Sequence, residues 1–407
     1  MRISMNKTLK IYLSTLLLSS IIWSQPFSGG PRITTVFLIL LGIFVFTKNM
    51  ISFNDQRITR FSQIIACFWI PAILSLIGSF DLESSLKMII LLPLFIPFAG
   101  GIIYLKDNYA DNKLLINIVT VVCVLWVTDG LIQFTFGQDI FGILPRDGER
   151  IVGPFAHHLR LSLFLSITLP LILPRLEKYG WGLLISYLAM AALVIMLSGV
   201  RTDLLTALIA IGIYVVTKKR AKLLLLFLPL LLVMGLLASS YSNIAQHKLN
   251  SFSGVPDNYK EWNNMSSHRL EIWLTAWNMY LDNPFKGVGA KSFSYAYDEY
   301  KGADSLFDSD TISHAHHPII SIAAETGTIG LVGLFMALWL LLYKWGGKSR
   351  MENTLENPWL QMLILIFFPI QSMPLLFTLW WFPVVSMVIL FYLSDIDLQH
   401  KSVGSSV

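Results

Sequence analysis

Long apolar runs, separated by short polar segments, recur along nearly the whole chain. A helix needs about 20 apolar residues to cross a hydrocarbon core of about 30 Å, and these runs are roughly 15 to 25 residues long. They are continuously apolar and do not alternate, which favours helices over a membrane β-barrel. We count about twelve runs, and because several are short or closely spaced, a count of about ten or eleven stays open. The runs cover residues 10–23, 33–47, 61–79, 86–104, 114–136, 157–174, 181–198, 202–217, 221–239, 318–343, 359–378 and 380–394.

This pattern predicts an all-α polytopic membrane protein with about 12 transmembrane helices. The composition agrees, because 55% of the residues are hydrophobic, 14% are charged and the mean hydropathy is +0.63. A soluble globular domain has about 25% charged residues. The composition therefore excludes that class of protein.

Lysines and arginines gather in every second loop, and short basic loops stay on the cytoplasmic side of a membrane. The basic positions are Arg2, Lys7, Lys10, Lys48, Arg57, Arg60, Lys106, Lys113, Arg175, Lys178, Lys218, Lys219, Arg220, Lys222, Lys344, Lys348 and Arg350. The alternation predicts that both termini are cytoplasmic and that loops 24–32, 80–85, 137–156, 199–201 and 240–317 face outward. The net charge of +5 is then an orientation signal, and we recognise no nucleic-acid-binding module. The first run lacks a small-x-small cleavage site, so we interpret it as a retained helix and not as a signal peptide.

The chain reads as a single membrane domain, residues 1–407, with one polar subdomain, residues 240–317, inserted between the ninth and tenth runs. Within this loop, apolar residues recur at helical spacing from Leu270 to Leu281, and Asn283-Pro284 ends the helix. A glycine-rich turn follows at residues 285–289. Aromatic residues of this region suit an amphipathic helix at the level of the lipid headgroups, and they are Trp262, Trp273, Trp277 and Tyr280.

Two arginines fall on the predicted outward face. Arg201 lies in the hairpin between the runs 181–198 and 202–217, where an arginine either anchors a helix end or binds an anion. Asp203 is near enough in sequence to be its partner, which would weaken the case for a ligand. Arg269 starts the predicted loop helix, and by position alone it reads as a solvated surface residue.

Three histidines, His314, His316 and His317, stand where the polar loop meets the tenth run. A histidine titrates near neutral pH and can take a proton from a hydroxyl group, although a histidine at a membrane surface is more often structural. Their segment holds no carboxylate cluster, which argues against zinc. Cys67 and Cys123 both lie within predicted runs, which argues against a disulfide or a thiolate metal site.

Two carboxylates lie inside predicted spans. Glu325 follows nine residues after His316, and Asp129 lies within the fifth run. An ionisable group in a span needs a partner inside the bundle. Glu325 is therefore a candidate either for orienting a histidine or for packing the helices.

Residues 316–331 read His-His-Pro-Ile-Ile-Ser-Ile-Ala-Ala-Glu-Thr-Gly-Thr-Ile-Gly-Leu. This run resembles the C-terminal signature of the O-antigen ligase and polymerase superfamily, in which a histidine precedes an apolar stretch that ends Glu-x-Gly-x-x-Gly-Leu. Arg269-Leu270-Glu271-Ile272-Trp273 and the later Asn283-to-Gly289 segment are similar to the family's periplasmic loop, and Ser198-Gly199-Val200-Arg201 is similar to its arginine hairpin. The family commonly has Asn after the histidine, where this chain has His317.

The resemblance implies a metal-independent glycosyltransferase of the bacterial inner membrane that needs no cofactor. Such an enzyme moves a glycan from undecaprenyl pyrophosphate, at the periplasmic face, to a hydroxyl group, which belongs to lipid A-core for a ligase and to another lipid-linked repeat unit for a polymerase. We favour the ligase. The resemblance also implies catalytic roles for His316, Arg201 and Arg269, because arginine forks match a pyrophosphate and an imidazole accepts a hydroxyl proton. Glu325, His317 and His314 are expected to support them.

A further outward loop contains Arg150 and Arg160, which either contact the pyrophosphate or anchor the chain at the interface. The sequence has no glycine-rich phosphate loop, which agrees with a lipid-linked donor that needs no ATP.

Two other functions stay open. A repeat-unit O-antigen polymerase would use the same donor on the same face. A membrane transporter is suggested by Asp129, by Glu325 and by helix-breaking prolines, but no inverted repeat is visible.

Overall fold

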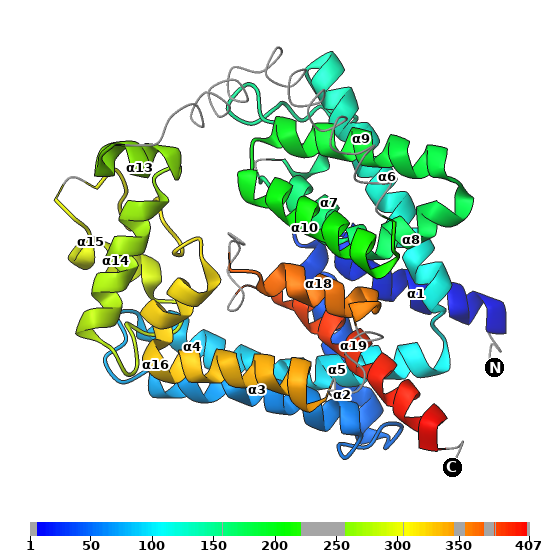
Figure 1. The fold of residues 1–407 in the computed structure, drawn as a ribbon. Coiled ribbons are helices and arrows are strands. Elements are labelled where there is room, and N and C mark those ends of the chain that lie inside the picture. Colours follow the sequence, from blue (N-terminus) through cyan, green and yellow to red (C-terminus); the bar gives the residue numbers. More distant parts are fainter. Residues whose placement is uncertain are drawn as a thin grey trace. The chain divides into compact units, whose positions relative to one another are not determined.

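The structure is a computed structural model, and it describes residues 6–156, 158–220, 257–303, 305–345, 355–369, 378 and 380–404. Over these residues the chain is helical, and the extended pairing found there is one isolated bridge between Arg146 and Arg150 (Figure 1). The expectation of an all-α fold is therefore confirmed for the described part of the chain. The predicted run 221–239, the first part of the loop, residues 240–256, and residues 370–377 of the eleventh run lie outside the described residues.

The described helices include five that are long and apolar enough to cross a membrane: Gly30–Thr47, Leu82–Asn108, Asn112–Phe136, Trp181–Ser198 and Pro318–Lys344. Pro318–Lys344 is a 27-residue span, and the shorter helix Pro358–Phe367 is also apolar. The protein is thus a multi-pass membrane protein. The count of about twelve spans, the orientation and the single-domain organisation stay predictions.

The contacts of the chain group it into two compact units. Unit 1 comprises Met1–Thr34, Leu105–Val255 and Leu355–Ile366, and unit 2 comprises Thr35–Tyr104, Pro256–Thr354 and Phe367–Val407. Boundaries between them fall within three helices, α2 (Gly30–Thr47), α5 (Phe95–Asn108) and α18 (Pro358–Phe367).

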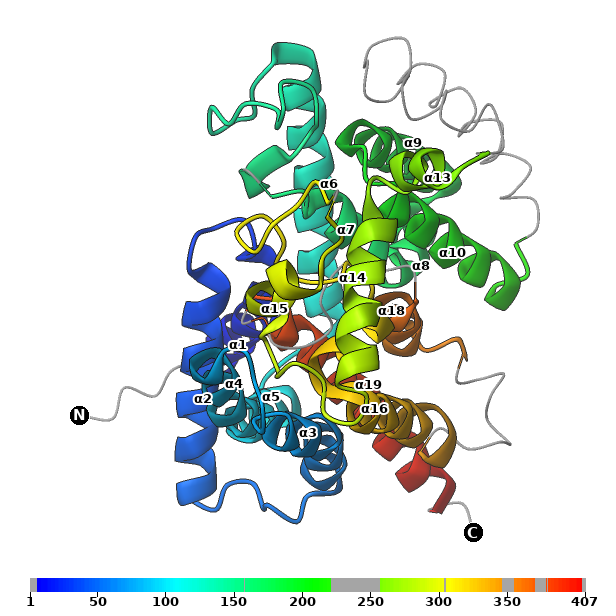
Figure 2. The same cartoon turned by 90° about the vertical axis from the view of Figure 1, so that its left-hand side faces the viewer.

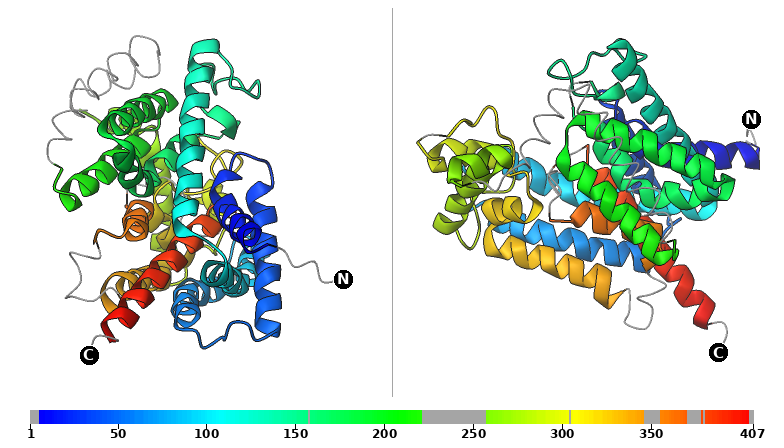
Figure 3. Two further views of the ribbon diagram at one scale, coloured as in Figure 1. Left: turned by 90° about the vertical axis from the view of Figure 1, so that its right-hand side faces the viewer. Right: turned by 45° about the horizontal axis from the view of Figure 1, so that its top comes forward.

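In unit 1, the long helix α6 (Asn112–Phe136) contacts helices from both sides of it in the sequence, and α7 to α10 lie together (green in Figure 3). The other elements of this unit are α1 (Lys7–Trp23), η2 (Gly153–Phe155), α7 (Leu161–Ile167), α8 (Leu169–Tyr179), α9 (Trp181–Ser198), α10 (Arg201–Thr217) and α18 (Pro358–Phe367). The hairpin between α9 and α10 is tight because Gly199 takes a left-handed conformation, with φ +69°, that glycine adopts without strain. Arg201 is consequently the first residue of α10.

In unit 2, α3 and α16 lie side by side (Figure 1), and α14 contacts both α15 and α16 (Figure 2). The bounds are α3 (Gln56–Leu74), α4 (Leu82–Leu91), η1 (Leu92–Leu94), α13 (Tyr259–Met265), α14 (Arg269–Asp282), α15 (Phe293–Tyr300), α16 (Pro318–Trp339), η3 (Leu340–Lys344) and α19 (Phe382–Gly404). The predicted loop helix at 270–281 is confirmed as α14. Its apolar face joins a buried cluster with α15 that includes Ile272, Met279, Phe293 and Tyr297.

The packing of α3 against α16 depends on a small residue. A Cβ atom added to Gly333 would stand 2.0 Å from the carbonyl oxygen of Cys67 on α3, far inside van der Waals contact. Small residues let helix backbones approach closely in a membrane, where apolar burial alone does not favour association. Gly212 of α10, by contrast, has no atom within 4 Å of an added Cβ.

We expect Gly333→Ala to lower the free energy of unfolding by about 1 to 3 kcal/mol, because the two helices must separate. Gly212→Ala is the matched control, and it should be neutral or stabilising by up to about 1 kcal/mol, because alanine is the better helix former. Thermal unfolding of both variants in detergent measures the difference. Equal midpoints for the two variants would contradict the close contact.

Candidate functional site

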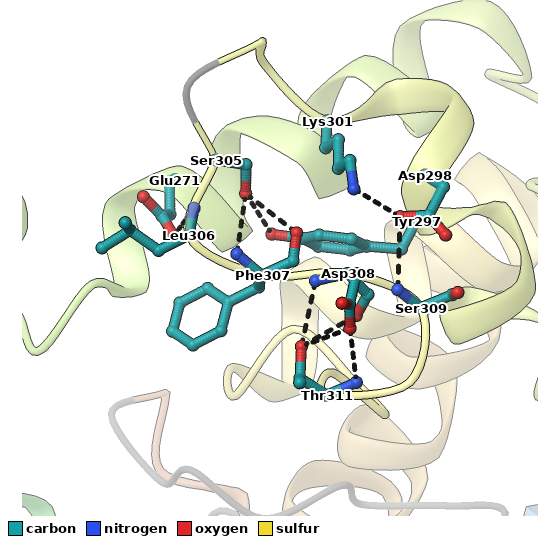
Figure 4. A network of polar contacts seen from close by, with 10 residues as sticks. All are labelled: Glu271, Tyr297, Asp298, Lys301, Ser305, Leu306, Phe307, Asp308, Ser309 and Thr311. Carbon is teal, nitrogen blue, oxygen red and sulfur yellow. Dashed lines mark hydrogen bonds and ion pairs between the residues drawn. The ribbon is translucent and has the colours of Figure 1, made fainter.

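The loop that leads to the histidines is held by polar contacts (Figure 4). The Tyr297 hydroxyl lies 3.4 Å from Ser305 Oγ, and the Asp298 carboxylate accepts from the backbone N–H of Ser309 at 3.3 Å. Asp308 and Thr311 close a turn in which the backbone N–H of Thr311 donates to Asp308 Oδ1 at 3.0 Å. These contacts attach the loop to α15 immediately before residue 313.

The start of α14 lies against the histidine segment, residues 314–317. Trp273 Nε1 donates a hydrogen bond of 2.9 Å to the carbonyl oxygen of Ala315, and its ring meets that of His317 edge to face at 5.5 Å. Burial lowers the pKa of His317 below its ordinary value, and the positive charge of nearby Arg269 lowers it further. The structure thus brings Arg269 and the histidine segment together within unit 2.

Two of the histidines lie against each other. The ring centroids of His314 and His316 are 4.1 Å apart, and Ser313 Oγ lies 2.8 Å from His314 Nδ1. His316 has φ +51°, a left-handed conformation that is uncommon for residues other than glycine. Such a conformation persists where the surroundings enforce it, as they often do at functional sites.

His317 is the N-cap residue of α16. Its Nδ1 accepts a hydrogen bond of 3.4 Å from the backbone N–H of Ile320, so it satisfies a helix N–H group that would otherwise have no partner in the helix. Asn is among the best N-cap residues because its side-chain oxygen accepts the same kind of bond. The difference between His317 and the commoner Asn is therefore explained, since both residues can cap the helix.

The Glu325 side chain is buried, with 6% of its surface exposed, and lies inside a candidate span. The backbone N–H groups of Lys291 and Phe293 donate to its carboxyl group. The partners that a buried ionisable group needs are therefore the positive charge of Lys291 and a pair of backbone donors.

Unit 1 brings two of the predicted arginines together. Arg150 Nη2 donates to the carbonyl oxygen of Gly199 at 3.3 Å, two residues before Arg201. The backbone N–H of Ile151 also donates to the Leu197 carbonyl at 3.3 Å, which joins the two segments. Burial lowers the pKa of both guanidinium groups. An anionic ligand would offset the desolvation that causes this shift.

The surroundings of Arg160 and Asp203 are connected through α7. Arg160 is the N-cap residue of α7, and the Ser162 hydroxyl donates to Asp203 Oδ2 at 2.6 Å. Ser166 Oγ donates to the backbone carbonyl of Asp203 at 2.7 Å. Asp203 thus links α10 to α7, a role that its place beside Arg201 in the sequence did not indicate.

Sequence reasoning missed Gln133, which holds the loop that carries Arg150. Its Oε1 accepts from the backbone N–H groups of Val152 and Gly153 at 2.8 and 2.9 Å, and its Nε2 donates to the Ile143 carbonyl at 3.0 Å. The signal in the sequence was a glutamine near the end of an apolar run, because its side-chain amide can both donate and accept hydrogen bonds. Asp129 serves the same loop, because its Oδ1 accepts from the Ile140 N–H at 3.0 Å.

The predicted site residues therefore form two groups. In unit 1, Arg150 is hydrogen-bonded to the segment that carries Arg201, and Arg160 belongs to the same unit. The second group, in unit 2, comprises Arg269, the three histidines and Glu325. The convergence of these two groups stays a prediction. Within the described part of the chain, no group of three or more His, Cys, Asp or Glu side chains is arranged to hold a metal ion.

These features define a helical multi-pass membrane protein with arginines and histidines at the ends of its apolar helices. Residues 186–335 match a family model described as O-Antigen ligase, which supports the resemblance to the O-antigen ligase and polymerase superfamily. Arg201, Arg269, His316 and Glu325 all fall inside the matched residues. The comparison with curated proteins found no match.

The family match supports a ligase or polymerase type of function in lipopolysaccharide assembly. It suggests a glycosyltransferase-like enzyme that acts on lipid-linked sugars and implies a lipid-linked glycan donor.

We expect His317→Asn to keep the helix cap and to remove a pH dependence. In the unfolded chain His317 takes up a proton near its ordinary pKa of 6.5, and in the folded chain only at a lower pH. Between these two values the unfolded state binds more protons, so the free energy of unfolding falls as the pH drops below 6.5. Thermal unfolding between about pH 5 and 8 should show this loss in the parent protein and a smaller loss in His317→Asn.

His317→Ala is the control, and it should be about 1 kcal/mol less stable than His317→Asn at all pH values because it removes the cap. If His317→Asn and the parent protein showed the same pH dependence, the capping role of the neutral imidazole would be wrong.

Proposed function

We propose that the protein is an O-antigen ligase. It transfers a polysaccharide from undecaprenyl pyrophosphate to a hydroxyl group of lipid A-core, at the periplasmic face of the bacterial inner membrane. The observation that carries this proposal is the placement of Arg269 and Trp273 against the histidine segment, inside residues that match the ligase family.

In the proposed reaction the acceptor oxygen forms a bond to the anomeric carbon of the glycan, and the bond from that carbon to the pyrophosphate breaks. His316 accepts the proton of the acceptor hydroxyl or holds that hydroxyl in line with the anomeric carbon. The pyrophosphate leaves on its lipid carrier with several negative charges. Arg201 and Arg269 bind these charges and stabilise them as they grow.

The remaining predicted residues have secondary roles in this proposal. Arg150 and Arg160 contact the pyrophosphate, and the link from Arg150 to Gly199 supports a position near Arg201. His314 and His317 support His316, one by ring contact and the other by capping the helix that follows. We propose no metal ion and no cofactor, since the arginines supply the positive charge that the leaving group requires.

The alternative is a repeat-unit polymerase, in which the accepting hydroxyl belongs to a second lipid-linked unit. The match to the ligase family agrees with either enzyme. Both functions require the same donor and the same cationic site.

We expect Arg201→Ala, Arg269→Ala and His316→Ala each to reduce transfer by at least about 100-fold, because each removes a charge or a base used in the transition state. Arg→Lys at either arginine should restore activity only in part, because lysine lacks the planar fork that binds two oxygens at once. The assay follows transfer from a defined lipid-linked glycan by membrane-inserted protein at matched abundance. Activity of His316→Ala equal to that of the parent would remove the catalytic assignment.

The acceptor is tested by competition. With lipid A-core and a second lipid-linked unit offered together, the ligase should extend lipid A-core and leave the second unit unchanged. In a deletion strain, loss of the ligase should leave full-length chains on the lipid carrier and bare core on a polysaccharide gel. Core that carries a single repeat would instead identify the polymerase.

A further inference from the structure

The helix that follows the histidines is interrupted inside the membrane span. In α16, Gly327 has φ +65° and ψ −160°, so the helix has a first half, residues 318–326, and a second half from residue 328. An interruption leaves backbone N–H and C=O groups without helical partners, and hydrocarbon offers them no hydrogen bonds. Irregular backbone at this depth persists only where other parts of the protein satisfy it.

A second stretch of chain supplies the missing bonds. We call residues 283–289, between α14 and α15, the glycine segment. It donates from Val288 N–H to the Ala324 carbonyl at 2.9 Å and from Gly289 N–H to the Glu325 carbonyl at 3.0 Å. In return, the N–H groups of Thr328 and Ile329 donate to the carbonyls of residues 284 and 285 at 2.8 and 3.2 Å. At the break, each of the two stretches therefore both donates and accepts backbone hydrogen bonds.

The two backbones approach too closely for side chains. A Cβ atom on Gly287 would lie 2.4 Å from the carbonyl carbon of Glu325, and one on Gly327 would lie 2.4 Å from that of Phe285. Both glycines also have φ near +65°, at +67° and +65°. Each glycine is therefore required twice, once for its conformation and once for the close approach.

The end of the glycine segment and the residue after it, residues 288–290, also form hydrogen bonds with the region around the turn between α3 and α4. The backbone N–H of Phe80 donates to the Val288 carbonyl, and that of Ala290 to Ser75 Oγ, both at 3.0 Å. Ser85 Oγ donates to the Ala290 carbonyl at 2.7 Å. The end of α3, the start of α4 and the turn between them thus hold residues 288–290 in place.

Glu325 acts on this assembly through two different groups. Its backbone carbonyl accepts from Gly289, and its buried carboxyl group accepts from the N–H groups of Lys291 and Phe293 at the start of α15. We propose that Glu325 is a positioning residue. It holds the glycine segment and the start of α15 against the break in α16, and it exchanges no proton with the substrate.

This inference rests on the proposed function, because the element positioned is the half-helix that carries the histidines. The first half of α16 begins directly after His317, and Tyr280 of α14 adds a contact of 3.0 Å between its hydroxyl and Thr328 Oγ1 across the break. If the break closed or shifted, the histidine segment would move relative to the second half of the helix. Transfer would then slow even though every catalytic side chain was present.

The decisive comparison is Glu325→Gln with Glu325→Ala in the full-length, membrane-reconstituted protein. A glutamine side chain retains an oxygen that accepts from both N–H groups, so we expect kcat within about threefold of the parent and an unchanged pH profile of transfer. The alanine variant leaves two buried donors unsatisfied, and we expect kcat to fall at least about tenfold while the KM for the donor changes little. Glu299→Gln on the exposed face of α15 is the control and should change neither quantity.

Hydrogen exchange of the amides in residues 284–293 gives a readout that does not depend on activity. Exchange should be faster in Glu325→Ala than in the parent or in Glu325→Gln. If Glu325→Gln were as inactive as Glu325→Ala while its exchange matched the parent, Glu325 would be a proton-transfer group and the inference would be wrong. If the parent protein transferred no glycan, the proposed function would fail, whereas the exchange data would still decide how Glu325 acts.

A second pair of variants tests the break without touching Glu325. Gly287→Ala should raise the exchange of residues 284–293 and lower kcat, because the added Cβ meets the α16 backbone. Gly302→Ala is the matched control, since Gly302 has no atom within 4 Å of an added Cβ. Equal exchange in the two variants would overturn the proposed role of the glycine segment.

Discussion

Unit 2 depends on one constraint, which is that a backbone inside a membrane must have all its hydrogen bonds satisfied by protein. The regular helix is interrupted at Gly327, and the glycine segment forms four backbone hydrogen bonds there, to residues 324, 325, 328 and 329. These hydrogen bonds connect α16 with a segment about 40 residues earlier in the chain. Through them, the polar loop becomes part of the membrane helix assembly at the level where the histidine-bearing half-helix ends.

Buried polar side chains near the predicted site residues also have hydrogen-bond partners in the protein. The Glu325 carboxyl group accepts hydrogen bonds from two backbone N–H groups, and burial together with the charge of Arg269 lowers the pKa of His317. In unit 1, the half-buried guanidinium of Arg150 uses the Gly199 carbonyl as an acceptor. In the proposed glycosyl transfer, the negative charge of a pyrophosphate leaving group would be matched by cations that are partly desolvated in this way.

The agreement between expectation and structure differs from one element to the next. Helix α14 was predicted from apolar spacing between Leu270 and Leu281, and it forms over Arg269–Asp282. Trp273 was expected to belong to an amphipathic helix at the level of the lipid headgroups, which stays a prediction, and the structure shows that it hydrogen-bonds to Ala315 and contacts His317. The spacing of apolar residues reports that a helix has a buried face, whereas it does not report which partner covers that face.

The sequence alone determined the class of protein, the positions of the described apolar helices and the residues that carry the family resemblance. Hydropathy, charge and short motifs are local properties, and they add up along the chain without reference to distant residues. Only the tertiary structure decided that His317 caps a helix, that Asp203 binds Ser162 and that Gly287 meets the backbone of residues 324–326 beside the break in α16. Those contacts depend on the approach of two backbones from separate stretches of chain, and a contact of that kind leaves no periodic signal in either stretch.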